Sequence, residues 1–158
     1  MYKTPSKLSE STREDLIRTL NARLADGLDL HSQIKVAHWN VRGPQFPSLH
    51  PLFEQFANQL ATYNDSIAER AVTLGGLAAG TARHVAKSSR LSEYPQDTTR
   101  DLDHVRLVAE RFEIYLAGAR ESRELAQEHG DEESVGLLTD VITDFEKNAW
   151  FLRATLAY

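Results

Sequence analysis

The sequence contains no cysteine, and no run of apolar residues approaches the ~20 that cross a bilayer. Without cysteine there can be no disulfide, thiolate metal site or cysteine nucleophile, so any metal chemistry must use His, Asp and Glu. These ligand types narrow the candidate metals to iron, manganese and zinc. The first residues also lack the apolar stretch of a signal peptide, and we therefore expect a cytoplasmic protein that does not contact a membrane.

Positive charge is also scarce in this chain. It has 18 Lys and Arg against 23 Asp and Glu, for a net charge of −5, whereas nucleic-acid affinity comes mainly from clustered Lys and Arg. Near the N-terminus, Lys3 and Lys7 are followed closely by Glu10 and Glu14. This mixed charge indicates a short flexible tail at residues 1–9 and argues against a DNA-binding arm.

Apolar residues recur at spacings of three and four along most of the chain, which is the pattern of amphipathic helices. Glycine and proline divide this pattern into four long helices. The first ends before Gly43-Pro44, the second runs from Pro47 or Ser48 to Gly75-Gly76, the third from about Thr99 to Glu128, and the fourth from about Asp131 to the end. Residues 75–99 predict a long crossover that holds a short helix.

The chain is 41% hydrophobic and 26% charged, which suits a single domain with its own core. We expect residues 10–158 to form this domain as an all-α four-helix bundle. Pro47 and Pro51 should both lie near the start of the second helix, where the first four backbone N–H groups have no internal partner.

Ligand-type side chains alternate with small residues on one face of the second helix, away from its core stripe. This face carries His50, Glu54, Ala57, Ala61, Asp65, Ala68, Glu69 and Val72. Carboxylates on a helix are usually solvated, but three alanines between them indicate a surface that another helix approaches closely. The face therefore predicts a helix–helix contact that includes ionisable groups.

The length of the helix decides how a metal site could form on this face. His50 and Asp65 are 15 residues apart, which is ~22 Å along a helix, so one copy cannot bring them to the same ion. Two antiparallel copies related by a twofold axis can, because such a contact places residue i against residue j and j against i. We predict a site at a dimer interface, with His38 and His50 from one subunit and Asp65 and Glu69 from the other.

Imidazole and carboxylate ligands without sulfur suit a non-haem iron site that oxidises Fe(II) at an open coordination position. Glu54, one turn after His50, would be a further ligand or would hold a second iron through water. There is a plainer alternative, because a histidine such as His38 on an apolar stripe is more often a core or interface residue. On that alternative the chain is a helical bundle whose histidines and carboxylates only pack or face solvent.

Several motifs resemble the signature of the Dps family of miniferritins, the DNA-binding proteins from starved cells. They are His38-Trp39-Asn40-Val41-Arg42-Gly43, Phe46, Leu49-His50, Asp65-x-x-Ala68-Glu69-Arg70, Gly75-Gly76, Tyr94-Pro95 and Trp150-Phe151. The resemblance implies a ferritin-like four-helix bundle with a long crossover between the second and third helices. It also implies a hollow dodecamer that oxidises Fe(II), preferably with hydrogen peroxide, and stores ferric iron, with zinc as an alternative occupant of the site as isolated.

The resemblance assigns roles to individual residues as well. The implied iron ligands are His38, His50, Asp65 and Glu69, with Glu54 close by. Trp39 is implied to pack beside the site, although a helix-end aromatic is the plain alternative. The acidic residues implied to line threefold iron-entry pores are Asp131, Glu132, Glu133 and Asp140, although acids also stabilise a helix N-terminus without any pore.

Two features depart from the family pattern. Gly136 stands where relatives often have an acid, and His31, His84 and His104 are not required by the signature. His31 lies one heptad before His38 and could reach the metal region, but a core or surface role is the plainer interpretation.

A different class of function is a stress protein that mainly binds and compacts DNA, with secondary iron binding. The mixed charge of the tail argues against it, and we expect a ferroxidase and iron store.

Overall fold

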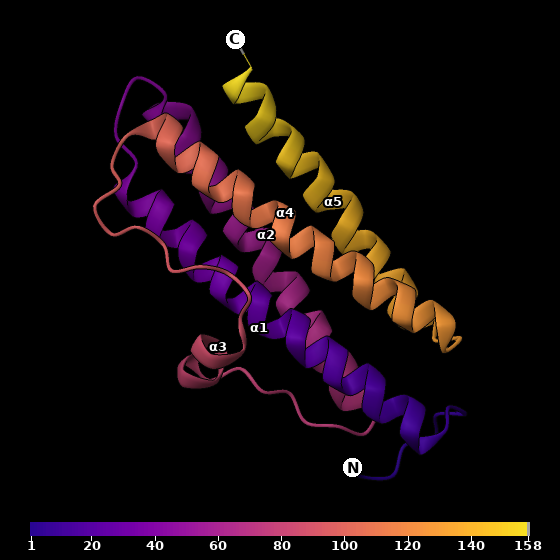
Figure 1. Ribbon diagram of the computed structural model, residues 1–158. Coiled ribbons are helices and arrows are strands. Elements are labelled where there is room, and N and C mark those ends of the chain that lie inside the picture. The colour runs from indigo at the N-terminus through magenta and orange to yellow at the C-terminus, as the bar shows by residue number, and fades with distance from the viewer. Residues whose placement is uncertain (158) are drawn as a thin grey trace.

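The computed structural model describes residues 1–157, which form five helices and no strand. The helices are α1 (Glu10–Asn40), α2 (Phe46–Thr73), α3 (Ala82–Ser88), α4 (Asp101–Glu128) and α5 (Glu132–Leu156). Figure 1 shows α1 beside α2 and α4 beside α5, with the crossover and its short helix α3 running along the outside of α1. This confirms the predicted all-α, ferritin-like bundle and the short helix in its crossover. Within residues 1–157, none of the helices is long and apolar enough to cross a membrane.

The link between α1 and α2 is held against the start of α4. Gly43 has a φ of +138°, and a Cβ at this position would lie 2.4 Å from the Asp101 carboxylate. Only glycine tolerates both conditions. The same carboxylate accepts a hydrogen bond from the Gln45 N–H at 2.9 Å, and the Arg42 N–H donates to the Thr99 carbonyl at 2.8 Å. The link therefore has a fixed course, and α1 ends before Gly43-Pro44 as predicted.

One expectation about the prolines was wrong. α2 begins at Phe46, so Pro47 lies among its first residues, but Pro51 lies beyond the first four backbone N–H groups and inside the helix. The absent N–H of Pro51 leaves the Pro47 carbonyl without its helical partner. Both prolines are exposed, so water can take this hydrogen bond.

The predicted apolar stripes of the four long helices meet in one core. Its aromatic centre joins three helices, with ring centroids of Phe56 and Phe112 5.3 Å apart and those of Phe112 and Phe145 5.1 Å apart, in edge-to-face geometry. Ala57 belongs to this core and is fully buried, although the helical wheel placed it on the outer face of α2. Burial of this small side chain depends on tertiary packing, which the wheel of a single helix does not show.

Buried ion pairs and hydrogen bonds fix the crossover. Asp26 of α1 is completely buried and accepts hydrogen bonds from the Arg90 backbone N–H at 2.9 Å and the Arg90 side chain at 3.0 Å. Arg23 also contacts this carboxylate, at 3.3 Å. Further along, Arg111 of α4 donates to the Glu93 carbonyl at 3.2 Å. These contacts hold the crossover against α1 and α4.

The N-terminal segment contacts the end of α2. The Tyr2 N–H donates to the Gly75 carbonyl at 3.1 Å, and the Thr4 hydroxyl donates to the Thr73 carbonyl at 3.0 Å. Ser9 then caps α1 by accepting a hydrogen bond from the Thr12 N–H at 3.2 Å. The flexibility of residues 1–9 stays a prediction.

Candidate metal centre

His38 and His50 lie together where α1 ends and α2 begins. Because the fixed link returns the chain on itself, the two imidazole rings stack with centroids 3.8 Å apart and planes 21° apart. Both side chains are partly buried in the single chain. Two of the predicted ligands are therefore brought together within one subunit.

Each of these histidines is held by the main chain of the other. His38 Nδ1 lies 2.7 Å from the His50 carbonyl oxygen, and His50 Nδ1 lies 2.9 Å from the His38 carbonyl oxygen. A carbonyl oxygen can only accept, so both Nδ1 atoms carry the proton and donate it. In the neutral imidazole, Nε2 then keeps a free lone pair, which is the form that binds a metal ion.

Glu54 completes this half of the site. Its Oε2 lies 3.3 Å from His38 Nε2, and it also forms an ion pair with Lys35. The hydrogen bond from Lys35 is the main cause that lowers the pKa of Glu54, so the carboxylate is ionised at neutral pH. The Glu54 carboxylate thus lies beside Nε2 of His38, and the His50 ring is stacked on the His38 ring.

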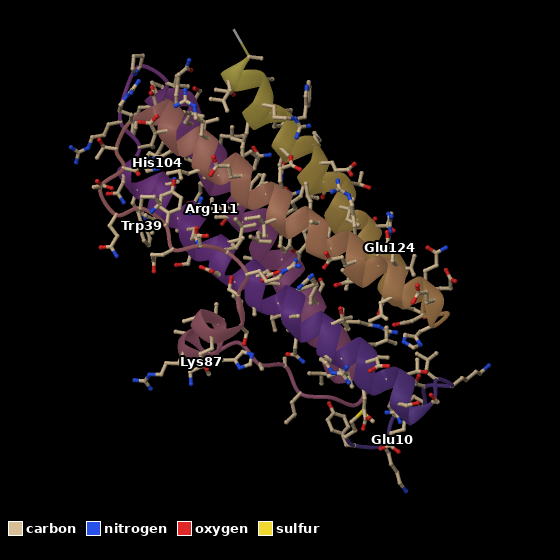
Figure 2. All side chains as sticks on the ribbon, in the orientation of Figure 1. Glu10, Trp39, Lys87, His104, Arg111 and Glu124 are labelled. Carbon is tan, nitrogen blue, oxygen red and sulfur yellow. The ribbon has the colours of Figure 1, made fainter. Side chains whose placement is uncertain are left out.

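Lys35 was not anticipated as part of this region. It lies three residues before His38, so it shares a helix face with it, and its ammonium also lies 5.7 Å from the ring centroid of Trp39. This helical spacing was the available signal. Trp39 itself is 67% exposed in the single chain, at the end of the bundle where Figure 2 also places His104.

Asp65 and Glu69 do not reach these histidines within one chain. Both are exposed and lie toward the other end of α2, one turn apart. Among residues 1–157, no group of three or more His, Asp and Glu side chains could hold a metal ion. The structure therefore separates the predicted ligands into two halves, as the axial distance along the helix requires.

A pocket of about 360 Å³ opens beside Asp65, between α1 and α2. Its walls are mainly apolar and include Leu24, Leu28, His31, Ala61, Asn64, Asp65 and Ala68. His31, whose role was left open, is partly buried in this wall. The pocket adjoins a second one of about 550 Å³ that includes Ala68 and Glu69.

The four acidic pore candidates are not equivalent. Asp131 is only 1% exposed and pairs with Arg70, so it ties the start of α5 to α2 within the subunit. A side chain so buried is not free to line a pore. Glu132, Glu133 and Asp140 are exposed and remain candidates.

His84 and His104, which the signature does not require, lie apart from this centre. His84 is exposed on α3, where it lies 3.4 Å from the Ser88 hydroxyl. His104 is completely buried, and its Nδ1 shares a hydrogen bond of 2.7 Å with the Tyr94 hydroxyl. Burial is the main cause that lowers the pKa of His104. Its role in the subunit is therefore structural.

Comparison with known proteins places this arrangement in a family. The Ferritin-like domain of the Ferritin family matches residues 17–158. A DNA protection during starvation protein of Agrobacterium fabrum is 36% identical over 153 residues, which is 97% of this chain and 94% of that protein. The chain belongs to the Dps family of ferritin-like proteins.

Solved Dps structures share the whole fold, including the crossover. DpsC from Streptomyces coelicolor superposes with a TM-score of 0.95 at 32% identity, over 99% of this chain and 92% of that one. A Dps protein from Vibrio cholerae, described as a member of a broad superfamily of ferritin-like diiron-carboxylate proteins, superposes with a TM-score of 0.91 at 28% identity, over 99% of both chains. This Dps chain thus covers more than nine-tenths of each of these three relatives.

Proposed function

We propose that this Dps chain is a ferroxidase subunit that oxidises Fe(II), preferably with hydrogen peroxide, and stores the ferric product inside a hollow dodecamer. The observation that carries the proposal is the reciprocal hydrogen bonding of His38 and His50. In the neutral imidazoles it leaves the Nε2 atoms for metal binding, and Nε2 of His38 lies 3.3 Å from the Glu54 carboxylate. Imidazole and carboxylate together favour a divalent first-row metal such as Fe(II), and zinc would compete for the same ligands.

The spacing of ligands on α2 supports a site shared by two subunits. His50 and Glu69 are equally distant from a point between Gln59 and Leu60, and so are Glu54 and Asp65. A twofold axis at this point, with the two copies of α2 antiparallel, would oppose His50 to Glu69 of the partner subunit. The same axis would oppose Glu54 to Asp65 of the partner subunit. One symmetry operation thus satisfies both ligand pairs.

The exposed surface around Asp65 supports the same contact. Ala61 and Val72 are exposed there in the single chain, and the two adjoining pockets are mainly apolar. Small and apolar side chains on an exposed helix face suit close approach of a second helix. Burial of this face would also exclude water from the iron.

The reaction itself would need little from the protein beyond binding and position. Two Fe(II) ions give one electron each to one hydrogen peroxide, which takes up two protons and leaves as two water molecules. The histidines would hold Fe(II) through neutral nitrogen, and the carboxylates would balance the additional positive charge of Fe(III). Consumption of both reactants would protect the cell, in keeping with the relatives' names. The cytoplasmic location and iron entry past Glu132, Glu133 and Asp140 belong to the same proposal.

The test is oxidation of Fe(II) by a stoichiometric peroxide pulse after anaerobic loading, followed by ferric absorbance. We expect the double variant His50→Ala, Asp65→Ala to oxidise Fe(II) at least about tenfold more slowly than the wild type, since it lacks a ligand from each half of the site. His84→Ala, which removes an exposed histidine elsewhere, is the matched control and should match the wild type. Equal rates in the double variant and the wild type would refute the proposed function.

A further inference from the structure

Pro51 weakens the helix that carries it and adds nothing to the core of the subunit. It stands inside α2, beyond the first turn, where proline removes a backbone hydrogen bond and its ring crowds the preceding turn. Both Pro51 and Pro47, one turn earlier, are exposed. Pro47 lies where proline is common in helices, but Pro51 does not. Its exposed ring therefore favours a role in a contact with another molecule.

The two prolines continue the face of α2 that carries the proposed iron ligands. Pro47 stands three residues before His50 and seven before Glu54, and both spacings keep side chains on one side of a helix. Pro51 follows Pro47 by four residues and borders the same face. The face thus begins with two apolar rings that have no backbone N–H.

A mainly apolar pocket of about 550 Å³ lies at the other end of this face. We call it the Val72 pocket, and its walls are Ala68, Glu69, Val72, Thr73 and Ala78. Of these described residues, Glu69 alone is charged. Val72 is 37% exposed in the single chain, although its side chain is apolar. The short side chains of the two alanines leave room for a ring from another molecule.

The twofold axis of the proposed iron site would bring these two ends of α2 together. Pro47 lies as far before the midpoint, between residues 59 and 60, as Val72 lies after it. Pro51 and Ala68 are equidistant from the same point. An antiparallel contact would therefore oppose Pro47 to the partner subunit's Val72, and Pro51 to the partner subunit's Ala68. Both of these opposed residues line the Val72 pocket.

We propose that Pro47 and Pro51 of each subunit seat in the Val72 pocket of a second copy of this chain, twice in each dimer. The inference rests on the proposed function, because it uses the same axis, and it names the residues that let this chain pair with itself. A proline ring against short apolar side chains removes apolar surface from water, and proline brings no N–H that would lose a hydrogen bond. The contact adjoins His50 and Glu69 in the sequence, so it also excludes water from the iron.

The test introduces one charge at each end of the contact, in metal-free protein. Pro47→Glu adds a negative charge in the first turn of α2, and Val72→Lys adds a positive charge in its last turn, where each charge favours the helix. Circular dichroism should therefore show folded subunits in both variants. Each variant alone should form the wild-type assembly only at a protein concentration at least about tenfold higher, because each buries an unpaired charge against an apolar group.

The decisive sample is an equal mixture of the two variants. In a mixed dimer one contact pairs the two new charges and the other contact is unchanged, so assembly should return to within about threefold of the wild-type concentration. Native mass spectrometry and analytical ultracentrifugation measure the assembly. Ser48→Glu is the control, since it adds the same charge in the same turn, about 100° around the helix from Pro47. It should assemble as the wild type does.

The outcomes separate this inference from the proposed function. If Pro47→Glu and Val72→Lys each assemble as the wild type does, or if their mixture does not recover, the prolines do not seat in the Val72 pocket of a second copy. That result leaves the oxidation of Fe(II) to be judged by its own test. If the mixture recovers while the double variant His50→Ala, Asp65→Ala oxidises Fe(II) at the wild-type rate, the contact stands and the proposed iron site fails.

Discussion

His38 and His50 each donate the Nδ1 proton to the other's carbonyl oxygen, at 2.7 and 2.9 Å. This pair depends on the course of the five-residue link between α1 and α2, because the carbonyls belong to the ends of those helices. The tautomer of a pair of candidate ligands is thus fixed by main-chain geometry within one subunit, before any partner contributes.

The link itself can be tested at Gly43. Gly43→Ala should destabilise the subunit by about 1–3 kcal/mol, because the positive φ and the Asp101 carboxylate at 2.4 Å both oppose a Cβ. Fe(II) oxidation should also slow, since the histidine pair loses its geometry. Chemical denaturation and the peroxide pulse measure the two effects. Gly136→Ala is the control: a Cβ there meets nothing within 4 Å, near the start of α5, and the change should be neutral or stabilising.

Lys35 should weaken the binding of a cation at the site formed by His38, His50 and Glu54. Lys35→Gln removes the positive charge paired with Glu54 and frees this carboxylate, so anaerobic Co(II) affinity should rise, by roughly two- to fivefold for a partly exposed pair. Titration calorimetry measures the change. Lys87→Gln on exposed α3 should leave the affinity unchanged (Figure 2). A lower affinity in Lys35→Gln would mean that the lysine supports the site.

Acid should destabilise the subunit through His104. Its pKa in the folded protein lies below the ordinary value of 6.5 because of burial, with the carbonyls of Thr98 and Asn40 and the charge of Asp103 opposing this effect in part. Below pH 6.5, His104 therefore binds more protons in the unfolded chain than in the folded protein. Its contribution to the free energy of unfolding is fully present above pH 6.5 and is lost as the pH falls below that value. Denaturant midpoints between pH 7.5 and 5 should fall less in His104→Asn, which cannot titrate there. An equal fall in both proteins would exclude His104 as the cause.

The buried Asp26 should hold the crossover in place. Asp26→Asn leaves Arg23 and Arg90 side by side with only the exposed carboxylate of Glu121 to balance their charge, and we expect a loss of about 3–5 kcal/mol. Limited proteolysis should then cut the crossover faster. Asp97→Asn, an exposed substitution in the same crossover, should change neither measurement.

The fold was largely predictable because its signals are local. The pairs Gly43-Pro44 and Gly75-Gly76 end helices through the backbone properties of glycine and proline. Apolar residues spaced by three and four face the core. The division of the ligands into two halves was predictable for the same reason, since the distance from His50 to Asp65 along one helix follows from residue count alone.

The features that escaped prediction depend on tertiary contacts. Asp131 was a reasonable pore candidate at a helix N-terminus, but Arg70, 61 residues earlier, buries it in an ion pair. Ala57 lies on the outer face of an isolated helix, and only tertiary packing buries it. The close approach of the Asn64 amide to Gly27 likewise requires the register of α1 on α2, which no local pattern gives.

The most direct test of a site shared between subunits is complementation. His50→Ala and Asp65→Ala subunits, each expected to oxidise Fe(II) at least about tenfold more slowly than the wild type when alone, are unfolded together and reassembled. A mixed dimer then has one site lacking both side chains and one complete site, so random pairing should restore about a quarter of the wild-type rate of Fe(II) oxidation. If the mixture is as inactive as either variant alone, His50 and Asp65 of different subunits do not form one site, and the central claim is wrong.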